Sequence, residues 1–153
     1  MNGIGRIESA VPAQNRQRSS AVSLKGLRVL IAEDEPIIAL DLASAFESAG
    51  AEAIVVHTLQ NAIAVARVDA LSAAVVDLRL KHDLSSPLCA LLQLREIPFV
   101  IYTGYDDMGC RYNSLIMPKP TPAHLIVERL AILTLHRSEK ATPLRSLQVS
   151  RHR

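Results

Sequence analysis

Short apolar runs alternate along the chain with longer segments in which apolar residues recur at helical spacing. Runs rich in Val, Ile and Leu predict five β-strands: Leu27–Ala32, Ala53–Val56, Ala73–Val76, Pro98–Tyr102 and Leu115–Met117. The longer segments predict four helices: Pro36–Ala49, Leu59–Val68, Ser86–Arg95 and Pro122–His136. Three of these helices have a proline in their first turn, where its missing N–H group leaves no hydrogen bond unmade.

The alternation of strands with helices determines the fold class that we expect. Strand–helix–strand units form parallel sheets with right-handed crossovers, and the helices cover both faces. We therefore predict an α/β fold, a doubly wound five-stranded parallel sheet with helices on both faces. Ligands bind to such sheets beyond the carboxyl ends of the strands, so functional side chains are sought there.

Charge divides the chain of 153 residues into three parts, although its net charge is only +2. Residues 1–25 carry a net charge of +3, residues 26–136 carry −5, and residues 137–153 carry +4. We predict a flexible arm over 1–25, one folded domain over 26–136 and a basic, flexible tail over 137–153. Because the predicted domain is acidic, we expect no direct DNA binding, which needs a basic patch on the folded body.

The sequence also bears on the cellular compartment. The polar stretch at residues 1–21 lacks the apolar core of a signal peptide. No run approaches the roughly 18 apolar residues that a membrane span requires. We expect a cytoplasmic protein with no membrane association, and the 17 residues after His136 are too few to fold as a DNA-binding domain.

Polar and charged side chains follow four of the five predicted strands. Glu33 and Asp34 follow the first strand, Asp77 the third, Thr103 the fourth, and Lys119 the fifth. Carboxylates that converge repel one another unless a cation neutralises them, and Mg²⁺ prefers such oxygen ligands. A carboxylate nucleophile beside a metal ion is typical of phosphoryl transfer, so we expect a carboxylate to be phosphorylated here.

Four motifs at these strand ends resemble the receiver domain of two-component response regulators. They are Val29–Glu35 (VLIAEDE), Val75–Asp77 (VVD), Tyr102–Tyr105 (YTGY) and Met117–Pro120 (MPKP). The resemblance covers about residues 26–136 and implies the flavodoxin-like receiver fold. Ser86-Pro87 together with Ile97–Tyr105 is similar to the FATGUY group of single-domain receivers.

The resemblance implies a role for each residue at the strand ends. Asp77 corresponds to the phosphoacceptor. Glu33, Asp34, Asp77 and the backbone carbonyl of Arg79 correspond to the ligands of Mg²⁺. Thr103 and Lys119 correspond to the residues that bind phosphoryl oxygens, and the Lys119–Pro120 peptide is a candidate for the cis form. The implied phosphoryl donor is a histidine kinase, of the HWE type in many relatives of this group, or a phosphotransfer protein.

The chain departs from the receiver pattern at several positions. Ile116 stands where receivers usually have an aromatic switch residue. The stretch Gly104–Asn113 contains glycine, aspartate and asparagine, so we expect the fourth receiver helix to be shortened or absent and the stretch to act as the switch. The last predicted helix is apolar over more than one face, which leaves a homodimer through this helix open.

The sequence leaves three classes of function open. The leading one is a phosphoacceptor that is not itself an enzyme, with output through contacts with an unknown protein or as a phosphate sink. The second is a degenerate receiver that binds partners without phosphorylation. The third is an aspartyl-phosphate phosphatase resembling haloacid dehalogenases, but that family has a second aspartate where this chain has Arg79.

Overall fold

The computed structural model describes residues 22–68, 70–104, 112 and 114–141. The main strands are β1 (Arg28–Ala32), β2 (Glu52–Val56), β3 (Ala73–Val76), β6 (Phe99–Thr103) and β7 (Leu115–Pro118). The helices are α1 (Pro36–Ser48), α2 (Leu59–Val68), α3 (Ser86–Leu94) and α4 (Ala123–Ala141). Two further short strands, β4 (Arg79–Leu80) and β5 (Asp83–Leu84), pair as an antiparallel hairpin after β3.

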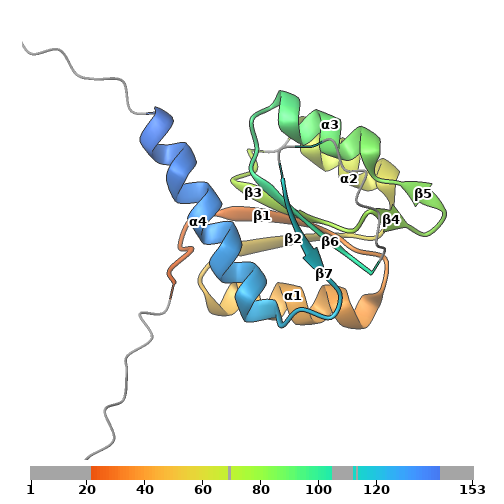
Figure 1. Ribbon diagram of the computed structural model, residues 1–153, viewed down its shortest axis with the longest axis horizontal. Helices are drawn as coiled ribbons and strands as arrows, with labels where there is room; N and C mark the ends of the chain where they lie inside the picture. Colours follow the sequence, from red (N-terminus) through yellow and green to blue (C-terminus); the bar gives the residue numbers. More distant parts are fainter. Residues whose placement is uncertain (1–21, 69, 105–111, 113, 142–153) are drawn as a thin grey trace, which may run out of the picture.

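The five main strands form one parallel sheet in the order β2-β1-β3-β6-β7 (Figure 1). The chain leaves β1 toward β2 on one side and later returns from β3 toward β6 and β7 on the other. The strand order therefore reverses between β1 and β3, which is the place where doubly wound sheets bind ligands. The predicted fold class is confirmed.

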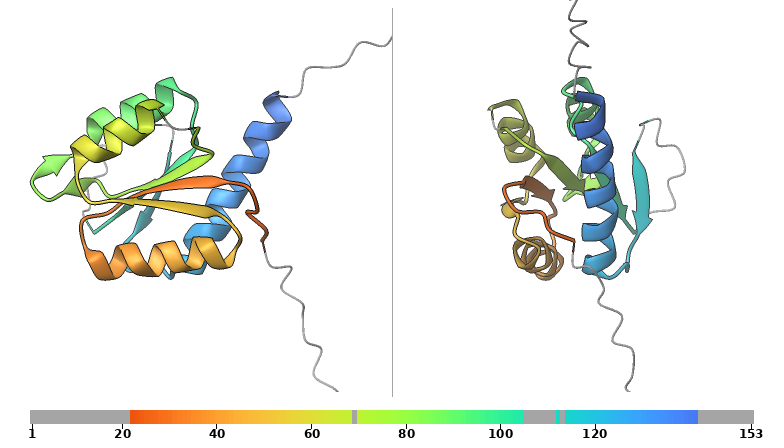
Figure 2. Two further views of the ribbon diagram at one scale, coloured as in Figure 1. Left: turned by 180° about the vertical axis from the view of Figure 1, so that it is seen from behind. Right: turned by 90° about the vertical axis from the view of Figure 1, so that its left-hand side faces the viewer.

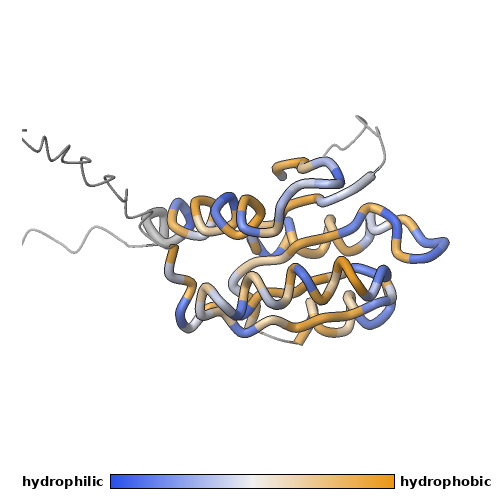
Figure 3. Tube along the Cα trace, turned by 90° about the horizontal axis from the view of Figure 1, so that it is seen from below, coloured by the Kyte–Doolittle hydropathy of each residue, from blue (hydrophilic) through white to orange (hydrophobic). Residues whose placement is uncertain are grey.

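Alternate residues of the strands supply two separate cores, one on each face of the sheet. Val29 and Ile31 of β1 pack with Leu42 and Phe46 of α1 and with the apolar side of α4. Leu30 of the same strand packs on the opposite face with α2 and α3. Figures 1 and 2 show α2 and α3 together on one face, with α1 on the other. Figure 3 shows that hydrophobic positions concentrate in the strands and that the tip of the β4–β5 hairpin is hydrophilic.

The folded body extends beyond both boundaries expected from charge. Leu24 is only 3% exposed and its N–H donates to the Ala49 carbonyl at 2.8 Å, so the end of the predicted arm belongs to the core. Gly50 ends α1 with a φ of +93°, and a Cβ atom there would lie 3.4 Å from the Lys25 backbone. At the other end, α4 continues to Ala141, past the expected end at His136.

Other expectations fall partly outside the described residues. The shortened fourth helix and the switch stretch include residues 105–111 and 113, which are among the residues not described. The flexibility expected of residues 1–21 and 142–153 concerns undescribed residues as well. Within the described part of the chain, no helix is both long enough and apolar enough to cross a membrane.

Candidate functional site

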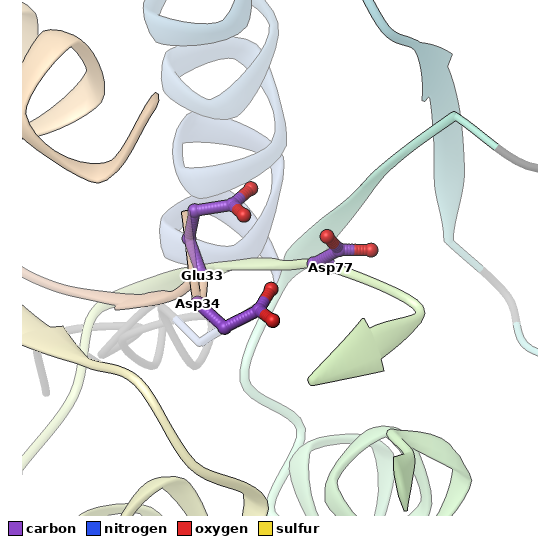
Figure 4. A group of neighbouring side chains, drawn as sticks. All are labelled: Glu33, Asp34 and Asp77. Atoms are coloured by element: carbon purple, nitrogen blue, oxygen red, sulfur yellow. The ribbon is translucent and has the colours of Figure 1, made fainter. Parts of the chain in front are cut away.

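Three carboxylates meet at the carboxyl edge of the sheet (Figure 4). Glu33 and Asp34 directly follow β1, and Asp77 directly follows β3. Because β1 and β3 are neighbouring parallel strands, their ends lie side by side, and one oxygen from each carboxylate lies within 4.8 Å of the others. Glu33 and Asp77 are buried, at 1% and 7% exposure, whereas Asp34 is partly exposed.

Backbone N–H groups orient all three carboxylates. The N–H of Glu35 donates to Oε1 of Glu33 at 3.1 Å, and the N–H of Arg79 donates to Oδ1 of Asp77 at 3.1 Å. The N–H of Lys81, at the turn of the β4–β5 hairpin, donates to Oδ2 of Asp34 at 2.9 Å. Each carboxylate therefore keeps oxygen lone pairs available for a further partner.

Lys119 supplies positive charge at the centre of this group. Its Nζ donates to Oδ2 of Asp77 at 2.7 Å and lies 2.7 Å from Oε2 of Glu33 and 3.8 Å from Oε1 of Glu35. The Glu33 contact is an ion pair with a buried carboxylate oxygen. One ammonium thus contacts two of the three clustered carboxylates, Glu33 and Asp77, and the site as a whole is net negative.

Burial and these contacts shift two pKa values. Burial raises the pKa of Glu33 above its ordinary value, and the Asp77 charge raises it further, although Lys119 and the Glu35 N–H group oppose the shift. Burial works against the charged form of Lys119, but its contacts with Asp77 and Glu33 outweigh burial and raise the pKa of its ammonium. The ionised form of Glu33 is therefore disfavoured, whereas the charged form of Lys119 is favoured.

Thr103 and Arg79 also lie at the site, Thr103 at the end of β6 and Arg79 at the start of β4. Thr103 ends β6, is 3% exposed, and its carbonyl accepts the Lys119 N–H at 2.9 Å. Arg79 begins the hairpin directly after Asp77-Leu78, so its backbone is part of the site, while its residue as a whole is exposed. All the residues predicted from strand ends thus gather at the expected edge.

Sequence reasoning missed Ser85. This residue is fully buried, and its hydroxyl donates to the Asp77 carbonyl at 2.5 Å. Its position before Ser86-Pro87 is typical of a helix N-cap, but the side chain makes no capping hydrogen bond. A serine near a helix start gives no signal that distinguishes these two uses.

The donor set fits a hard divalent cation. Glu33, Asp34 and Asp77 offer carboxylate oxygens at short mutual distance, and Oε2 of Glu33 is buried with the Lys119 ammonium 2.7 Å away. Mg²⁺ is usually bound through one or two carboxylates, and waters and phosphate oxygens complete its octahedral shell. The single ammonium of Lys119 leaves enough negative charge for such an ion.

Comparison with solved structures shows which proteins this chain is similar to. A response regulator receiver protein from Sinorhizobium medicae superposes with a TM-score of 0.68 at 23% identity, covering 75% of this chain and 99% of that one. SdrG from Sphingomonas melonis is 30% identical, with a TM-score of 0.61 over 71% of this chain and 96% of that one. The chain belongs to the response regulator receiver family. No protein-family model and no curated protein sequence matches it.

A third receiver domain is informative about the site. The receiver domain of the sensor histidine kinase PA1611 from Pseudomonas aeruginosa is 19% identical, with a TM-score of 0.63 over 71% of this chain and 98% of that chain. That structure contains a magnesium ion coordinated in its active-site cleft.

In the present receiver, Ile116 of β7 is 40% exposed, and the Lys119–Pro120 peptide is cis.

Proposed function

We propose that this receiver accepts a phosphoryl group on Asp77 from the phosphohistidine of a histidine kinase or phosphotransfer protein. The observation that carries the proposal is the placement of the Asp77 carboxylate. It lies at the topological switch point with Glu33 and Asp34 on one side and the Lys119 ammonium 2.7 Å from Oδ2. A carboxylate in these surroundings has a neutralising cation beside it and lies where doubly wound sheets bind their ligands.

The transfer is a simple displacement at phosphorus. An oxygen of Asp77 attacks and forms the new P–O bond as the P–N bond to histidine breaks. The bonding electrons remain on the histidine nitrogen. The product is an aspartyl phosphate, and no oxidant, reductant or water is needed.

The chain's own residues contribute to this step in two ways. The Arg79 N–H and the Ser85 hydroxyl hold the Asp77 side chain and carbonyl in place. Lys119 stabilises negative charge on the transferring phosphoryl oxygens, and we assign the Thr103 hydroxyl to a further phosphoryl oxygen by the resemblance to receivers.

We propose Mg²⁺ as the required cofactor, held by Glu33, Asp34, Asp77 and the backbone carbonyl of Arg79. Bound there, the ion would supply positive charge that stabilises the negative phosphoryl oxygens. The fit of the donor set and the magnesium ion of the P. aeruginosa receiver support this proposal.

The remaining parts of the proposal concern partners and location. We assign the chain to the FATGUY-like receivers, with an HWE-type kinase as donor and output through protein contacts or as a phosphate sink. We propose that it acts in the cytoplasm, as a phosphoacceptor and not as an enzyme. Exposed apolar side chains on α4, Leu125, Ile132 and Leu135, are compatible with a homodimer through this helix.

Two alternatives stay available for test. A degenerate receiver would bind partners without phosphorylation, although Asp77, Lys119 and both acidic residues are present. A phosphatase of the haloacid dehalogenase type would use a second carboxylate two positions after its nucleophile, where this chain has Arg79.

The test is labelling of the purified protein with a phosphohistidine donor in the presence and absence of Mg²⁺. We expect acid-stable, base-labile label with Mg²⁺ and none with Asp77→Asn. Asp83→Asn is a matched control, because Asp83 is an exposed carboxylate of the adjacent hairpin. Full labelling of Asp77→Asn would overturn the assignment, and an unlabelled wild type would favour the degenerate receiver. Steady release of phosphate from added phosphomonoesters would favour the phosphatase.

A further inference from the structure

Tyr102 lies directly before Thr103 in β6 and is buried, at 6% exposure. Its hydroxyl donates to the carbonyl of Thr121 at 3.2 Å and accepts the Thr121 N–H at 3.4 Å. Thr121 is two residues before the start of α4, and its own hydroxyl donates to the Pro118 carbonyl at 2.6 Å. The phenol thus connects the central sheet to the segment that leads into α4.

The ring of the same residue meets Lys119. The Lys119 Nζ lies 5.4 Å from the centroid of the Tyr102 ring, which is within cation–π range. The same ammonium contacts Asp77 and Glu33, and 13% of the Lys119 side chain is exposed. A partly desolvated ammonium gains more from an aromatic ring than an exposed one, because water competes less for it.

These two contacts act on one segment of five residues, 118–122. The Lys119 N–H is bound to the Thr103 carbonyl at 2.9 Å, so the backbone of this segment is tied to the end of β6. The lysine side chain remains long and rotatable, and it faces acceptors on two separate loops. The Tyr102 ring lies within cation–π range of the Lys119 ammonium, and the Tyr102 hydroxyl binds the backbone of Thr121, two residues after Lys119.

We propose that Tyr102 is a positioning residue of the site. Its ring holds the Lys119 ammonium against the acidic side chains, and its hydroxyl links the position of Lys119 to the start of α4. The effect on phosphoryl transfer rests on the proposed function, but the positioning of Lys119 does not. Ring and hydroxyl have separate roles, so substitutions that remove one or both separate them.

The first measurement is made without metal or phosphoryl donor. NMR of the Lys119 Cε–H groups detects the ring, because protons over an aromatic face shift upfield. We expect this shift in the wild type and in Tyr102→Phe, and its loss in Tyr102→Leu. The exposed Lys81 serves as an internal reference. Lys119 shifts equal to those of Lys81 in the wild type would overturn the proposal.

The second measurement is amide exchange at Thr121. Both Tyr102→Phe and Tyr102→Leu lack the hydroxyl, so we expect faster exchange at Thr121 in both. Tyr112→Phe is the matched control, because the Tyr112 hydroxyl donates to the Ser86 carbonyl at 3.2 Å, away from Lys119. Unchanged exchange at Thr121 in Tyr102→Phe would contradict the link to α4.

The third measurement is the rate of labelling by a small acyl phosphate with Mg²⁺. Tyr102→Leu should lower the rate roughly 3- to 10-fold, the range that a partly desolvated cation–π contact supplies. Tyr102→Phe, which restores the ring, should recover most of it. Melting curves verify that each variant folds, and Tyr102→Met replaces Tyr102→Leu if the latter does not.

The outcomes separate this inference from the proposed function. A wild type that takes no label contradicts the proposed function, and the lysine shifts and Thr121 exchange still decide the role of Tyr102. A labelled wild type with an equally fast Tyr102→Leu variant contradicts the positioning role alone.

Discussion

Replacement of Asp34 tests the metal site most directly, because it changes one proposed ligand at the rim of the site. Asp34 is partly exposed, and its Oδ2 accepts the N–H of Lys81 at 2.9 Å. Asp34→Asn keeps an oxygen for this hydrogen bond and removes only the charge. Asp34→Ala removes both. The pair therefore distinguishes loss of a metal ligand from loosening of the β4–β5 hairpin.

The expected size of the effect comes from binding linkage. A ligand at about 100-fold excess over its dissociation constant stabilises the folded state by ~2.7 kcal/mol. A folded body of roughly 120 residues has an unfolding entropy of about 0.25 kcal/mol/K near its midpoint. Mg²⁺ should therefore raise the melting temperature of the wild type by about 10 °C. The dissociation constant for Mg²⁺ would already include the free-energy cost of moving the Lys119 ammonium away from Glu33 and Asp77. The ion would bind the same carboxylates that the ammonium contacts.

The assay is thermal unfolding with Mg²⁺ and with NaCl at matched ionic strength. The shift should be lost in both Asp34 variants, and without metal only Asp34→Ala should melt lower than the wild type. Glu52→Gln, which alters an exposed carboxylate paired with Arg28 far from the site, should keep the full shift. A wild type that melts equally with and without Mg²⁺, or an Asp34→Asn variant with a full shift, would refute the reasoning.

Three further predictions concern unfolding in urea without metal. Ser85→Ala should lower the free energy of unfolding by about 1–2 kcal/mol, because the Asp77 carbonyl loses a buried donor; an equal loss in Ser86→Ala would contradict this. Lys119→Met should lower it by about 3 kcal/mol at neutral pH, since buried carboxylates lose their ammonium, and the loss should shrink on acidification. Glu33→Gln should raise it at neutral pH, because burial raises the pKa of Glu33; this gain should vanish as the pH falls through that pKa. A gain that persists in acid would point to another cause.

Much of the fold could be predicted because strand and helix periods differ strongly in this chain. Ala73–Val76 was predicted with its observed bounds, and the first strand differs only by Leu27. Once the sheet is parallel, the carboxyl ends of neighbouring strands must meet, so Glu33, Asp34 and Asp77 could be placed together without any contact being known.

The β4–β5 hairpin could not be predicted, and the reason is local. Its strands have two residues each, too few for a period to appear. Its turn includes Lys81 at a φ of +59°, a conformation that sequence reasoning assigns to glycine, asparagine or aspartate. The hydrogen bond from the Lys81 N–H to Asp34 offsets part of the strain, and that partner is 47 positions away in the sequence.

The observed limits of the folded body differ from the predicted domain boundaries for another reason. Net charge separates residues 1–25 from the acidic body, but apolar contacts decide where packing begins: Leu24 is buried, and Val22 packs against the same core. The end of α4 is likewise set by its own helical hydrogen bonds and not by the change of charge near residue 137. Charge patterns report solvation, and the limits of a fold depend on contacts.

The electrostatics of the site bear on the choice between a phosphoacceptor and a degenerate receiver. A neutral Gln at position 33 could still accept the Glu35 N–H, but it would lose the ion pair with Lys119. Burial and the nearby Asp77 charge make the ionised form unfavourable, as the raised pKa of Glu33 indicates. A module that only binds partners gains nothing from this cost, whereas a site for a metal ion and a phosphoryl group requires the same negative oxygens. The proposed phosphorylation at Asp77 makes use of these negative oxygens, and it predicts that the metal dependence of stability and of labelling is lost together in Asp34→Asn.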